Sequence, residues 1–522
     1  MTTLMPSNPR GIRRLLIVVA ALTGALLEVL DTTITSVAVP QMMGNLGATL
    51  AEIGWVTTGY IISNVIILPL TGWLADQFGR KRFFAVSIVV FTVASLMCAL
   101  SGSLWALVFW RIIQGLGGGA LMATGQVIML DAFPVEKRGI ATAIFGMGVM
   151  IGPLLGPVLG GYLTDNYSWP AIFAVNIPFG ILAAILTVLY VPNADYDHDT
   201  QQTPIDYIGI LLLAVGMGAL QTVLERGQSE DWFSSRLIVA LSVTSVVGLV
   251  GFIAWELRTK YPVLDIRLFR VRSLSSGALF GAAVGLGLYG MQFLLPVYLQ
   301  NIRSFSAYQT GIIQLAPAVL STLSFMIAGP LTQTFGGRRM LFVGTILMAA
   351  GSALLANLTS QSSVDDLMPA LHLRAFSLGF LFIPLTTASL ADLTPRQLGA
   401  GSGIINLTRQ LGGSIGIAML ATLVDHRSTF HRDRLADHIA TSSQTAGTWT
   451  ANVQAALMHG GMDTADAHTA AIGKLAAVIG REAAVMSFND MYIVITLAFV
   501  IAAPLIYGLS KRTATGPMEG VH

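Results

Sequence analysis

Charged residues are scarce in this chain of 522 amino acids, since Asp, Glu, Lys and Arg together make up only 11% of it. Water-soluble domains carry roughly 25% charged residues, so this sequence could not cover a water-facing surface. The single cysteine, Cys98, excludes an internal disulfide and a thiolate metal cluster, and we expect it to pack as a small apolar residue. The formal charge of +2 is too small to argue for nucleic-acid binding.

Nucleotide-binding and metalloprotease motifs are also missing. The sequence has no Walker-type phosphate loop and no HExxH pair, so ATP-driven transport and zinc-dependent hydrolysis lack support. The eight histidines show no metal-ligand spacing, and His426, His431 and His438, in a polar segment, are expected to be solvated. We therefore predict a protein that is not an enzyme and that uses no metal or organic cofactor.

Apolar runs are what the sequence has in abundance. Hydrophobic residues make up 54% of the chain and occur in runs of roughly 20, the length that crosses about 30 Å of hydrocarbon. The first run is too long for a cleaved signal peptide and is interpreted as a helix. We predict an all-α integral membrane protein with fourteen spans, at residues 15–38, 51–74, 83–101, 104–130, 140–161, 170–191, 205–225, 236–257, 274–300, 308–331, 339–358, 366–391, 400–424 and 489–510.

The distribution of positive charge tests this count of spans. With the N-terminus in the cytoplasm, most of the 29 Lys and Arg residues fall in segments that are then cytoplasmic, at residues 10–14, 80–82, 137–138, 258–272, 338–339, 396 and 511–512. The short segments on the other side contain only Arg226, Arg236 and Arg303. By the positive-inside rule both termini are therefore predicted to be cytoplasmic. The segment 192–204 is an exception, because it is acidic and has no Lys or Arg.

An internal repeat predicts the domain organisation. Gly72–Arg82 reads GWLADQFGRKR and Gly329–Arg339 reads GPLTQTFGGRR, and a second pair, the spans opened by Arg111 and Arg374, lies in similar register. Many transporters are built from repeated halves with the substrate site at their interface. We expect an N-terminal six-helix bundle at 1–191, a two-helix insertion with linkers at 192–273, and a C-terminal six-helix bundle at 274–522 that includes a long extracytoplasmic loop at 425–488.

The turn between the second and third spans is a candidate gate. Gly72 and Gly79 permit close backbone approach, and Asp76 can meet a helix N-terminus or a cation of the next turn, such as Arg80. If such a contact breaks as the two halves rock, the turn acts as a gate. The alternative role of Arg80–Arg82 is to anchor the topology, and the two roles are compatible.

The fifth span has a stripe of glycines. Four of them recur at every fourth position and two prolines interrupt the same stretch: Gly148, Gly152, Pro153, Gly156, Pro157 and Gly160. Residues four apart lie on one helix face, so this face has no side chains. The pattern favours a bending helix that packs against the opposite half. The alternative is ordinary close helix packing within the bundle.

Charged residues inside the spans are functional candidates, because each costs about 2.5–3.5 kcal/mol to insert. Glu28 and Asp31 lie three residues apart on one face of the first span. Arg111, in the antiparallel fourth span, is expected at a depth similar to that of Asp31, about 10 Å from the outer end. A carboxylate whose surroundings differ between inward-open and outward-open states would take up and release a proton in each cycle. The alternative is a static ion pair.

The second half offers a different set of polar residues. The span 274–300 has no acidic residue that could pair with Arg374, so proton coupling is expected to be confined to the first half. Glu225 and Glu256 lie at helix ends, where each is expected to be solvated or to cap its helix. The residues that we expect to line a substrate cavity are Gln114, Tyr289, Gln292, Arg374, Asn406, Arg409 and Gln410. A structural hydrogen-bonding cluster is the alternative for Arg409 and its neighbours.

The loop 425–488 is unusually long. Its second part, Asp466–Met486, is rich in Ala, Ile and Leu and is predicted to be helical. Such a helix could lie on the membrane surface or dock a periplasmic partner.

Several of these motifs together resemble the EmrB/QacA-type fourteen-helix drug:proton antiporters of the major facilitator superfamily. LEVLDTTITSVAVP (27–40) resembles the first-helix motif of that family, RIIQGLGGG (111–119) its fourth-helix motif, and GVMIGPLLGPVLGG (148–161) its antiporter motif. VLERGQSEDWFSS (223–235), LLPVYLQ (294–300) and NLTRQLGGSIGIA (406–418) are similar to further signatures of the EmrB branch. The departures are Thr35-Ser36 in place of Val-Asn, and Gln333 in the second copy of the turn where the first has Asp76.

The resemblance implies roles for these motifs. Asp31 falls on the proposed proton-binding acid of the family, Arg111 on its proton-transfer arginine, and the fifth-span motif implies export. The long loop implies a periplasmic membrane-fusion adaptor as partner. We therefore expect a proton-coupled exporter of amphiphilic small molecules in a bacterial cytoplasmic (inner) membrane, driven by the proton gradient. The alternatives are a dedicated exporter of one metabolite, fatty acid or antibiotic, and a non-transporting membrane receptor.

Overall fold

The structure, a computed structural model, describes residues 11–134, 137–192, 206–305, 307–394, 397–441 and 444–510. These residues form helices and turns and no strand. The helices of the first part are α1 (Ile12–Leu46), α2 (Leu50–Phe78), α3 (Arg80–Ala99), α4 (Leu104–Gly118), α5 (Leu121–Asp131), α6 (Arg138–Tyr167), α7 (Ala171–Ala174) and α8 (Asn176–Tyr190).

The middle and last parts of the chain continue the same all-α pattern. The middle part contains α9 (Tyr207–Arg226), the short 3-10 turns η3 (Gln228–Glu230) and η4 (Trp232–Ser234), α10 (Arg236–Glu256) and η5 (Ile266–Arg270). The last part contains α11 (Arg272–Val297), the π-helical turn η6 (Tyr298–Ile302), α12 (Ala307–Phe335), α13 (Gly337–Leu355), α14 (Val364–Leu390), α15 (Leu398–Thr441), α16 (Gln444–His459), α17 (Thr464–Ala502) and η8 (Ala503–Gly508).

Thirteen helices in the described part of the chain are long and apolar enough to cross a membrane. The remaining predicted span, 140–161, falls within α6, a 30-residue helix in which the apolar stretch Ile140–Val149 is recognised. The all-α membrane fold is thus confirmed, whereas the count of fourteen and the cytoplasmic termini stay predictions. Arg10, Arg396, Lys511, Arg512 and nearly all of the acidic segment 192–204 lie outside the described residues.

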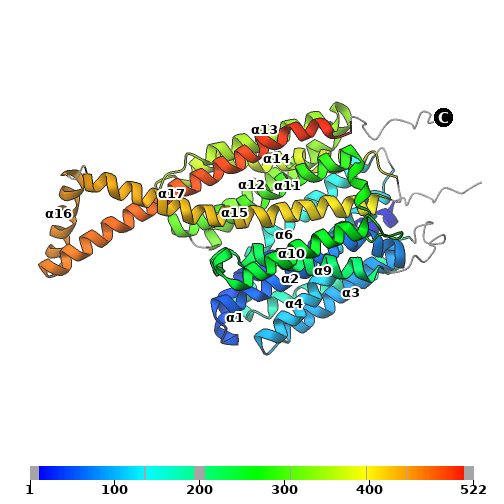
Figure 1. Ribbon diagram of the computed structural model, residues 1–522, viewed down its shortest axis with the longest axis horizontal. Helices are drawn as coiled ribbons and strands as arrows, with labels where there is room; N and C mark the ends of the chain where they lie inside the picture. Colours follow the sequence, from blue (N-terminus) through cyan, green and yellow to red (C-terminus); the bar gives the residue numbers. More distant parts are fainter. Residues whose placement is uncertain are drawn as a thin grey trace, which may run out of the picture.

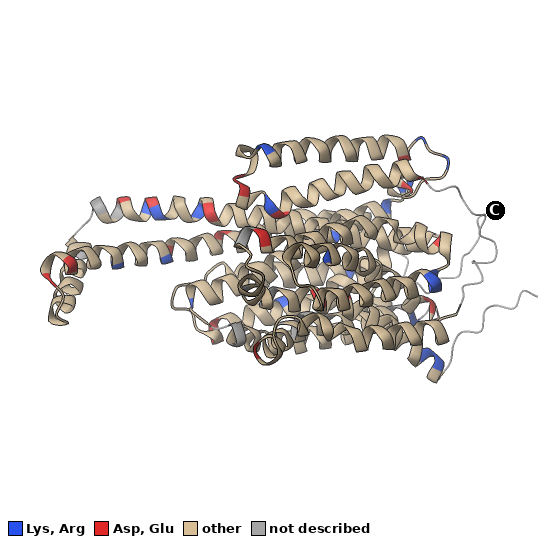
Figure 2. Cartoon of the chain, turned by 90° about the horizontal axis from the view of Figure 1, so that it is seen from below, with Lys and Arg blue, Asp and Glu red and all other residues tan. Residues whose placement is uncertain are grey.

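The spans lie side by side in one bundle (Figure 1). The first and last parts of the chain meet along two seams, where α6 packs on α12 and α2 packs on α15. Helix α9 contacts both α2 and α15, and α10 packs mainly on α9. Figure 2 shows several Lys and Arg positions, coloured blue, at one end of the bundle. We call this end, which includes Arg80–Arg82 and Arg338–Arg339, the basic end.

A run of glycines interrupts the predicted span 104–130, which is divided into α4 and α5. A Cβ atom on Gly115 would lie 2.4 Å from the backbone oxygen of Tyr60, and one on Gly119 would lie 2.5 Å from the backbone oxygen of Asn64. Only glycine permits an approach this close. Helix α4 therefore lies directly on α2, and this close packing positions Arg111 near α1.

The glycine stripe of α6 faces α1 of the same half, which agrees with the alternative of close packing within the bundle, while α6 itself also packs on α12 of the opposite half, as expected. Cβ atoms built on its members would meet α1 side chains, including Thr33 at 2.1 Å from Gly156 and Val29 at 2.8 Å from Gly152. The missing side chains let Thr33 Oγ1 donate to the carbonyl oxygen of Gly152 at 3.3 Å. The opposite half contacts α6 instead where the ring of Phe325 covers Gly146. The side chains of Pro153 and Pro157 lie outside the described part.

The segment 425–488, predicted as a long connecting loop with a helical second part, forms a helical hairpin along its described residues. Helix α15 continues to Thr441, α16 forms the tip, and α17 runs unbroken from Thr464 into the last span. The predicted helix at Asp466–Met486 is confirmed as part of α17. Figure 1 shows the hairpin projecting beyond the rest of the bundle at one end. The hairpin extends in line with two spans and so does not match the predicted helix lying on the membrane surface.

An ion-pair cluster braces the base of this hairpin. Asp490 of α17 accepts from Arg427 Nε at 2.6 Å and contacts His431 Nε2 at 2.8 Å, both on α15. His431 is therefore buried, and its prediction as a solvated residue is wrong. His426 is exposed, as predicted, and the side chain of His438 lies outside the described part.

Candidate functional site

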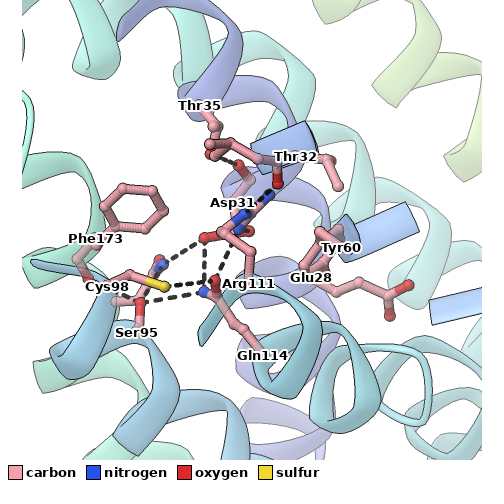
Figure 3. Close-up of polar contacts among 12 residues, drawn as sticks. Glu28, Asp31, Thr32, Thr35, Tyr60, Ser95, Cys98, Arg111, Gln114 and Phe173 are labelled. Carbon is pink, nitrogen blue, oxygen red and sulfur yellow. Dashed lines mark hydrogen bonds and ion pairs between the residues drawn. The ribbon is translucent and has the colours of Figure 1, made fainter. Parts of the chain in front are cut away.

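Asp31 and Arg111 form an ion pair buried within the first half of the molecule. Arg111 Nη1 lies 2.5 Å from Asp31 Oδ2, and both side chains are at most 1% exposed. The pair joins α1 to α4 at the depth that helix geometry predicted (Figure 3). The structure thus brings these two residues together. The low-dielectric surroundings strengthen the attraction between the two charges and also raise the cost of removing each from water. Removing one partner would therefore leave an unpaired buried charge and strongly destabilise the protein.

Two amide side chains complete the shell around the Asp31 carboxylate. Gln114 Nε2 donates to Asp31 Oδ1 at 2.8 Å, and Asn176 Nδ2 donates to the same oxygen at 3.0 Å. Both amides also donate to Ser95 Oγ, and Cys98 Sγ lies 3.8 Å from Gln114 Oε1. Gln114 is therefore fully buried beside the ion pair, and its prediction as a cavity residue is wrong. Sequence reasoning missed Asn176 and Ser95, because no motif relates α8 and α3 to the first span.

The Arg111 guanidinium has further partners. Its Nε donates to the backbone oxygen of Val56 at 3.1 Å, and its Nη1 also donates to Gln114 at 2.7 Å. The Cζ atom of Arg111 lies 4.2 Å from the ring centre of Tyr60 and 5.6 Å from that of Phe173. Aromatic faces attract a desolvated cation by up to about 2 kcal/mol. Arg111 is thus held in place independently of Asp31.

Glu28 points away from the Asp31–Arg111 ion pair, although it was predicted on the same face of the first span as Asp31. Three residues are less than a helical turn, so the two acidic side chains diverge by about 60° around α1. Glu28 accepts from Asn64 Nδ2 at 3.1 Å and from the backbone N–H of Met122 at 2.9 Å. Figure 3 shows its carboxylate directed away from Asp31.

A central cavity of about 940 Å³ lies between the two halves, and Glu28 is on its wall. Its lining comes from helices of both halves and from the inserted helix α9. Six of the seven predicted cavity residues line it, namely Tyr289, Gln292, Arg374, Asn406, Arg409 and Gln410. Polar walls of this kind, set among apolar side chains, are typical of small-molecule binding sites.

Polar contacts link the two halves across this cavity. Gln410 Nε2 of α15 donates to Asn64 Oδ1 of α2 at 3.4 Å, and Asn64 in turn donates to Glu28. Arg409 Nη2 donates to Asn406 Oδ1 at 2.6 Å, and its guanidinium lies 5.0 Å from the ring centre of Phe382. Arg409 therefore combines both predicted alternatives, because it is part of a hydrogen-bonded cluster and also lines the cavity.

Of the two acids at helix ends, Glu225 is solvent-exposed as expected, whereas Glu256 differs from our expectation. Glu225 lines the cavity, where its Oε2 accepts from Gln221 Nε2 at 3.2 Å. Gln221 also donates to Ser414 of α15 at 3.1 Å, so α9 is tied to the second half. Glu256 is only 2% exposed and is not solvated. The sequence carried no signal for the position of Glu225, because the insertion has no counterpart in the repeat.

The basic end of the cavity is closed. A Cβ atom on Gly72 of α2 would lie 2.7 Å from the backbone nitrogen of Ala400 at the start of α15. Beside this contact, Ser402 Oγ donates to Gln126 Oε1 at 3.3 Å. The cavity lining extends in the other direction, toward the hairpin, as far as Gln228, Gln300 and Ala421.

The turn after Gly72 forms a network at this closed end. Gly79, between α2 and α3, has a φ of 82°, a left-handed conformation that favours glycine. Arg80 forms an ion pair with Asp131 at the end of α5, so the candidate gate reaches the fourth predicted span. The role of Asp131 was not predicted.

Comparison with known proteins agrees with this architecture. The profile of the Major Facilitator Superfamily matches residues 21–417. The multidrug export protein EmrB of Escherichia coli strain K12 is 34% identical over 82% of this chain and 84% of its own length. The fatty acid resistance protein FarB of Neisseria gonorrhoeae is 32% identical over 92% of this chain and 93% of its own length.

Among solved structures, the proton:xylose symporter XylE has a similar fold. It aligns with a TM-score of 0.58 at 15% identity over 93% of this chain and 94% of its own. That likeness concerns the fold alone, whereas the sequence matches cover most of the chain. The chain accordingly belongs to the Major Facilitator Superfamily as a protein of the EmrB type, and it is a transporter and not an enzyme.

Proposed function

We propose that this protein is a proton-coupled exporter of amphiphilic small molecules that works by alternating access. The observation that carries the proposal is the position of the Asp31–Arg111 pair, sealed within the first half while Glu28 of the same helix borders the cavity. The Asp31 carboxylate lies close to the cavity but outside it. It can therefore couple binding of a proton to movement of α1 without contacting the substrate.

The proposal places the chain in the membrane as the charge pattern predicts. Fourteen spans with both termini cytoplasmic form a first bundle at 1–191, an insertion at 192–273 and a second bundle at 274–522. The basic end is then cytoplasmic. The closure of the cavity at that end supports an outward-facing state. The relatives' bacterial origin supports a bacterial inner-membrane location.

In the proposed cycle, Asp31 loses its negative charge when it binds a proton from the outer side. The attraction to Arg111 then weakens, and α1 can shift against α4. The protonated carrier releases substrate outward and returns to the inward-facing state, where the proton leaves. Glu28 bonds to Asn64 and thereby to Gln410 of the other half, so its protonation would loosen the connection between the halves.

The range of substrates separates two versions of the proposal. The similarity to a multidrug export protein supports a broad range, and the similarity to a fatty acid resistance protein supports a dedicated exporter. The projecting hairpin α15–α16–α17 supports a periplasmic membrane-fusion adaptor as partner. No cofactor is proposed, because the proton gradient supplies the driving force.

Substrate-evoked proton release from purified protein tests the proposal. The protein is placed in weakly buffered detergent solution, and ethidium or dodecanoate is added while binding is followed by tryptophan fluorescence. We expect binding to release protons, in proportion to the protein concentration. Binding of these compounds with no change in proton concentration would contradict proton coupling.

Enlarging Gly72 is expected to open the closed basic end. In a Gly72→Val variant the new side chain would collide with the backbone of Ala400, and overpacking of this kind costs about 1–3 kcal/mol. We expect pH-driven transport in proteoliposomes to fall about tenfold. A cysteine introduced as Ser402→Cys should react with a maleimide faster in this background than in the parent.

Gly54 provides the matched control, since it lies in the same helix with no atom within 4 Å of a built Cβ. A Gly54→Val variant should keep both the transport rate and the slow maleimide reaction. Equal labelling in the Gly72 variant and the parent would show that this contact does not close the cavity.

A further inference from the structure

Arg374 differs from Arg111 and Arg409, the other arginines inside the spans, because its guanidinium has no hydrogen-bond or ion-pair partner among the described residues. Arg111 is paired with Asp31, and Arg409 donates to Asn406. Among the described residues, the guanidinium of Arg374 donates no hydrogen bond and forms no ion pair, and its Nε is buried without an acceptor. An unpaired charge in the low-dielectric interior is strongly unfavourable, so such a group needs an anion or water.

The position of Arg374 directs this unpaired charge toward the cavity. Arg374 lies about 15 Å along α14, and the neighbours on its helix face, Leu371, Ala375 and Leu378, line the cavity with it. Behind it, α13 packs close to the α14 backbone at Gly351. The guanidinium is thus set on a rigid wall among apolar side chains.

The internal repeat shows what is missing. Arg111 and Arg374 hold similar positions in the two halves, and in the first half α1 supplies Asp31 as the counter-ion. In the second half, α11 contains no acidic residue at all. The phenol of Tyr492 interacts electrostatically with Arg374, but its hydroxyl is fully buried and forms no hydrogen bond. The described part of the chain therefore provides no anion for Arg374.

We infer that the substrate provides this anion, and that Arg374 binds the carboxylate head group of an amphiphilic organic acid. This inference rests on the proposed export function and names its substrate class. A guanidinium presents a fork of donors that matches a carboxylate, and such charge-assisted pairs are about twice as strong as neutral hydrogen bonds. The apolar part of the acid would contact Leu288, Phe293 and Phe382, which line the same cavity.

The other charges of the cavity are compatible with an anion at Arg374. Glu28 is held on α1 by hydrogen bonds from Asn64 and from the backbone of Met122, and Glu225 is on α9. Neither carboxylate forms an ion pair with Arg374. An acid that enters the cavity therefore meets a cation that forms no ion pair with any carboxylate of the described residues.

Binding of two matched probes to the purified full-length protein tests this inference. The probes are dansyl-labelled undecanoic acid and its primary amide, which differ only in the charge of the head group. At pH 7.5 we expect the wild type to bind the acid about tenfold more tightly than the amide, as expected for one charged hydrogen-bonded pair. Arg374→Gln should abolish this preference, and Arg374→Lys, which keeps the charge, should retain part of it.

Arg432→Gln is the charge-matched control, because Arg432 is exposed on the projecting hairpin and far along α15 from the cavity lining. It should bind both probes as the wild type does. A wild type that does not distinguish the probes, or an Arg374→Gln variant that still does, would overturn the inference. Displacement of the acid by phosphatidylglycerol, with no transport of the acid in proteoliposomes, would assign the site to a lipid and also overturn it.

These outcomes are separate from the fate of the proposed function. If probe binding releases no protons but still prefers the acid through Arg374, proton coupling fails and the anion site stands. If binding releases protons with no preference for the acid, the exporter proposal stands and Arg374 is not the head-group site.

Discussion

Replacing Asp31 by asparagine is expected to abolish pH-driven export while the protein remains folded. Asparagine has nearly the same shape but cannot take up a proton in the physiological range, so transport driven by a pH gradient should fall by at least about two orders of magnitude. Substrate-evoked proton release should disappear as well. The measurement is efflux from proteoliposomes with an imposed pH gradient, with binding of the same substrate followed in detergent.

The neighbours of Asp31 explain why this variant should fold. An asparagine oxygen can still accept from Gln114 and Asn176, which donate to Oδ1 in the wild type. Its amide group would face Arg111, however, so we expect a loss of about 1–3 kcal/mol in stability. A thermal melt and size-exclusion chromatography therefore accompany the transport assay.

Three further variants show which part of the site carries the coupling. Asp31→Glu keeps a titratable acid and should retain measurable pH-driven transport, unlike Asp31→Asn. Glu28→Gln should retain proton release that depends on Asp31, although its connection to Asn64 and Gln410 is altered. Arg111→Ala leaves Asp31 buried and unpaired, so we expect a loss of about 3–5 kcal/mol in addition to inactivity. Unchanged efflux in a folded Asp31→Asn protein would remove Asp31 from the mechanism.

A leucine at Gly156 is expected to prevent assembly of the first bundle. A Cβ at this position would lie 2.1 Å from Thr33 Oγ1 and 3.3 Å from the backbone nitrogen of Ile34, so α6 would have to move away from α1. Overpacking by one or two methylenes already costs about 1–3 kcal/mol, and leucine adds more. We expect little folded protein in a fluorescence size-exclusion profile, and a melting temperature lowered by several degrees in what remains.

Gly161 is the matched control on the same helix. No atom lies within 4 Å of a Cβ built there, so Gly161→Leu should express and melt like the wild type. Alanine has a higher helix propensity than glycine, and Gly161→Ala should be neutral or slightly stabilising. Equal expression of the two leucine variants would mean that the stripe facing α1 does not determine how tightly these helices pack.

Helix geometry made part of the site predictable from the sequence. The depth of Asp31 in one span and of Arg111 in an antiparallel span depends only on the rise per residue, and the structure places them in contact. The repeat likewise indicated Arg374, which lines the cavity. Spacing could not assign Gln114, however, because residues on the Arg111 face of α4 can meet either the cavity or α1. The rotation of α4 against α1 decided for α1.

The contacts between helices were beyond the reach of the sequence. The stripe from Gly148 to Gly160 shows that α6 is closely packed, yet nothing in its pattern distinguishes α1 from a helix of the other half. The partners Asn176 and Ser95, on α8 and α3, follow no spacing that relates them to Asp31. Glu225 lies in the insertion, so the repeat could not place it on the cavity wall.

By itself, the sequence determined that this protein is an all-α membrane transporter, with its basic residues at one end and its acid–arginine pair in the first half. Those properties depend on local composition, on apolar length and on helix periodicity, all of which are written along the chain. The tertiary structure alone decided which charges are neutralised. Asp31 pairs with Arg111, whereas no described residue pairs with Arg374, because ion pairing depends on how separate helices are rotated and packed.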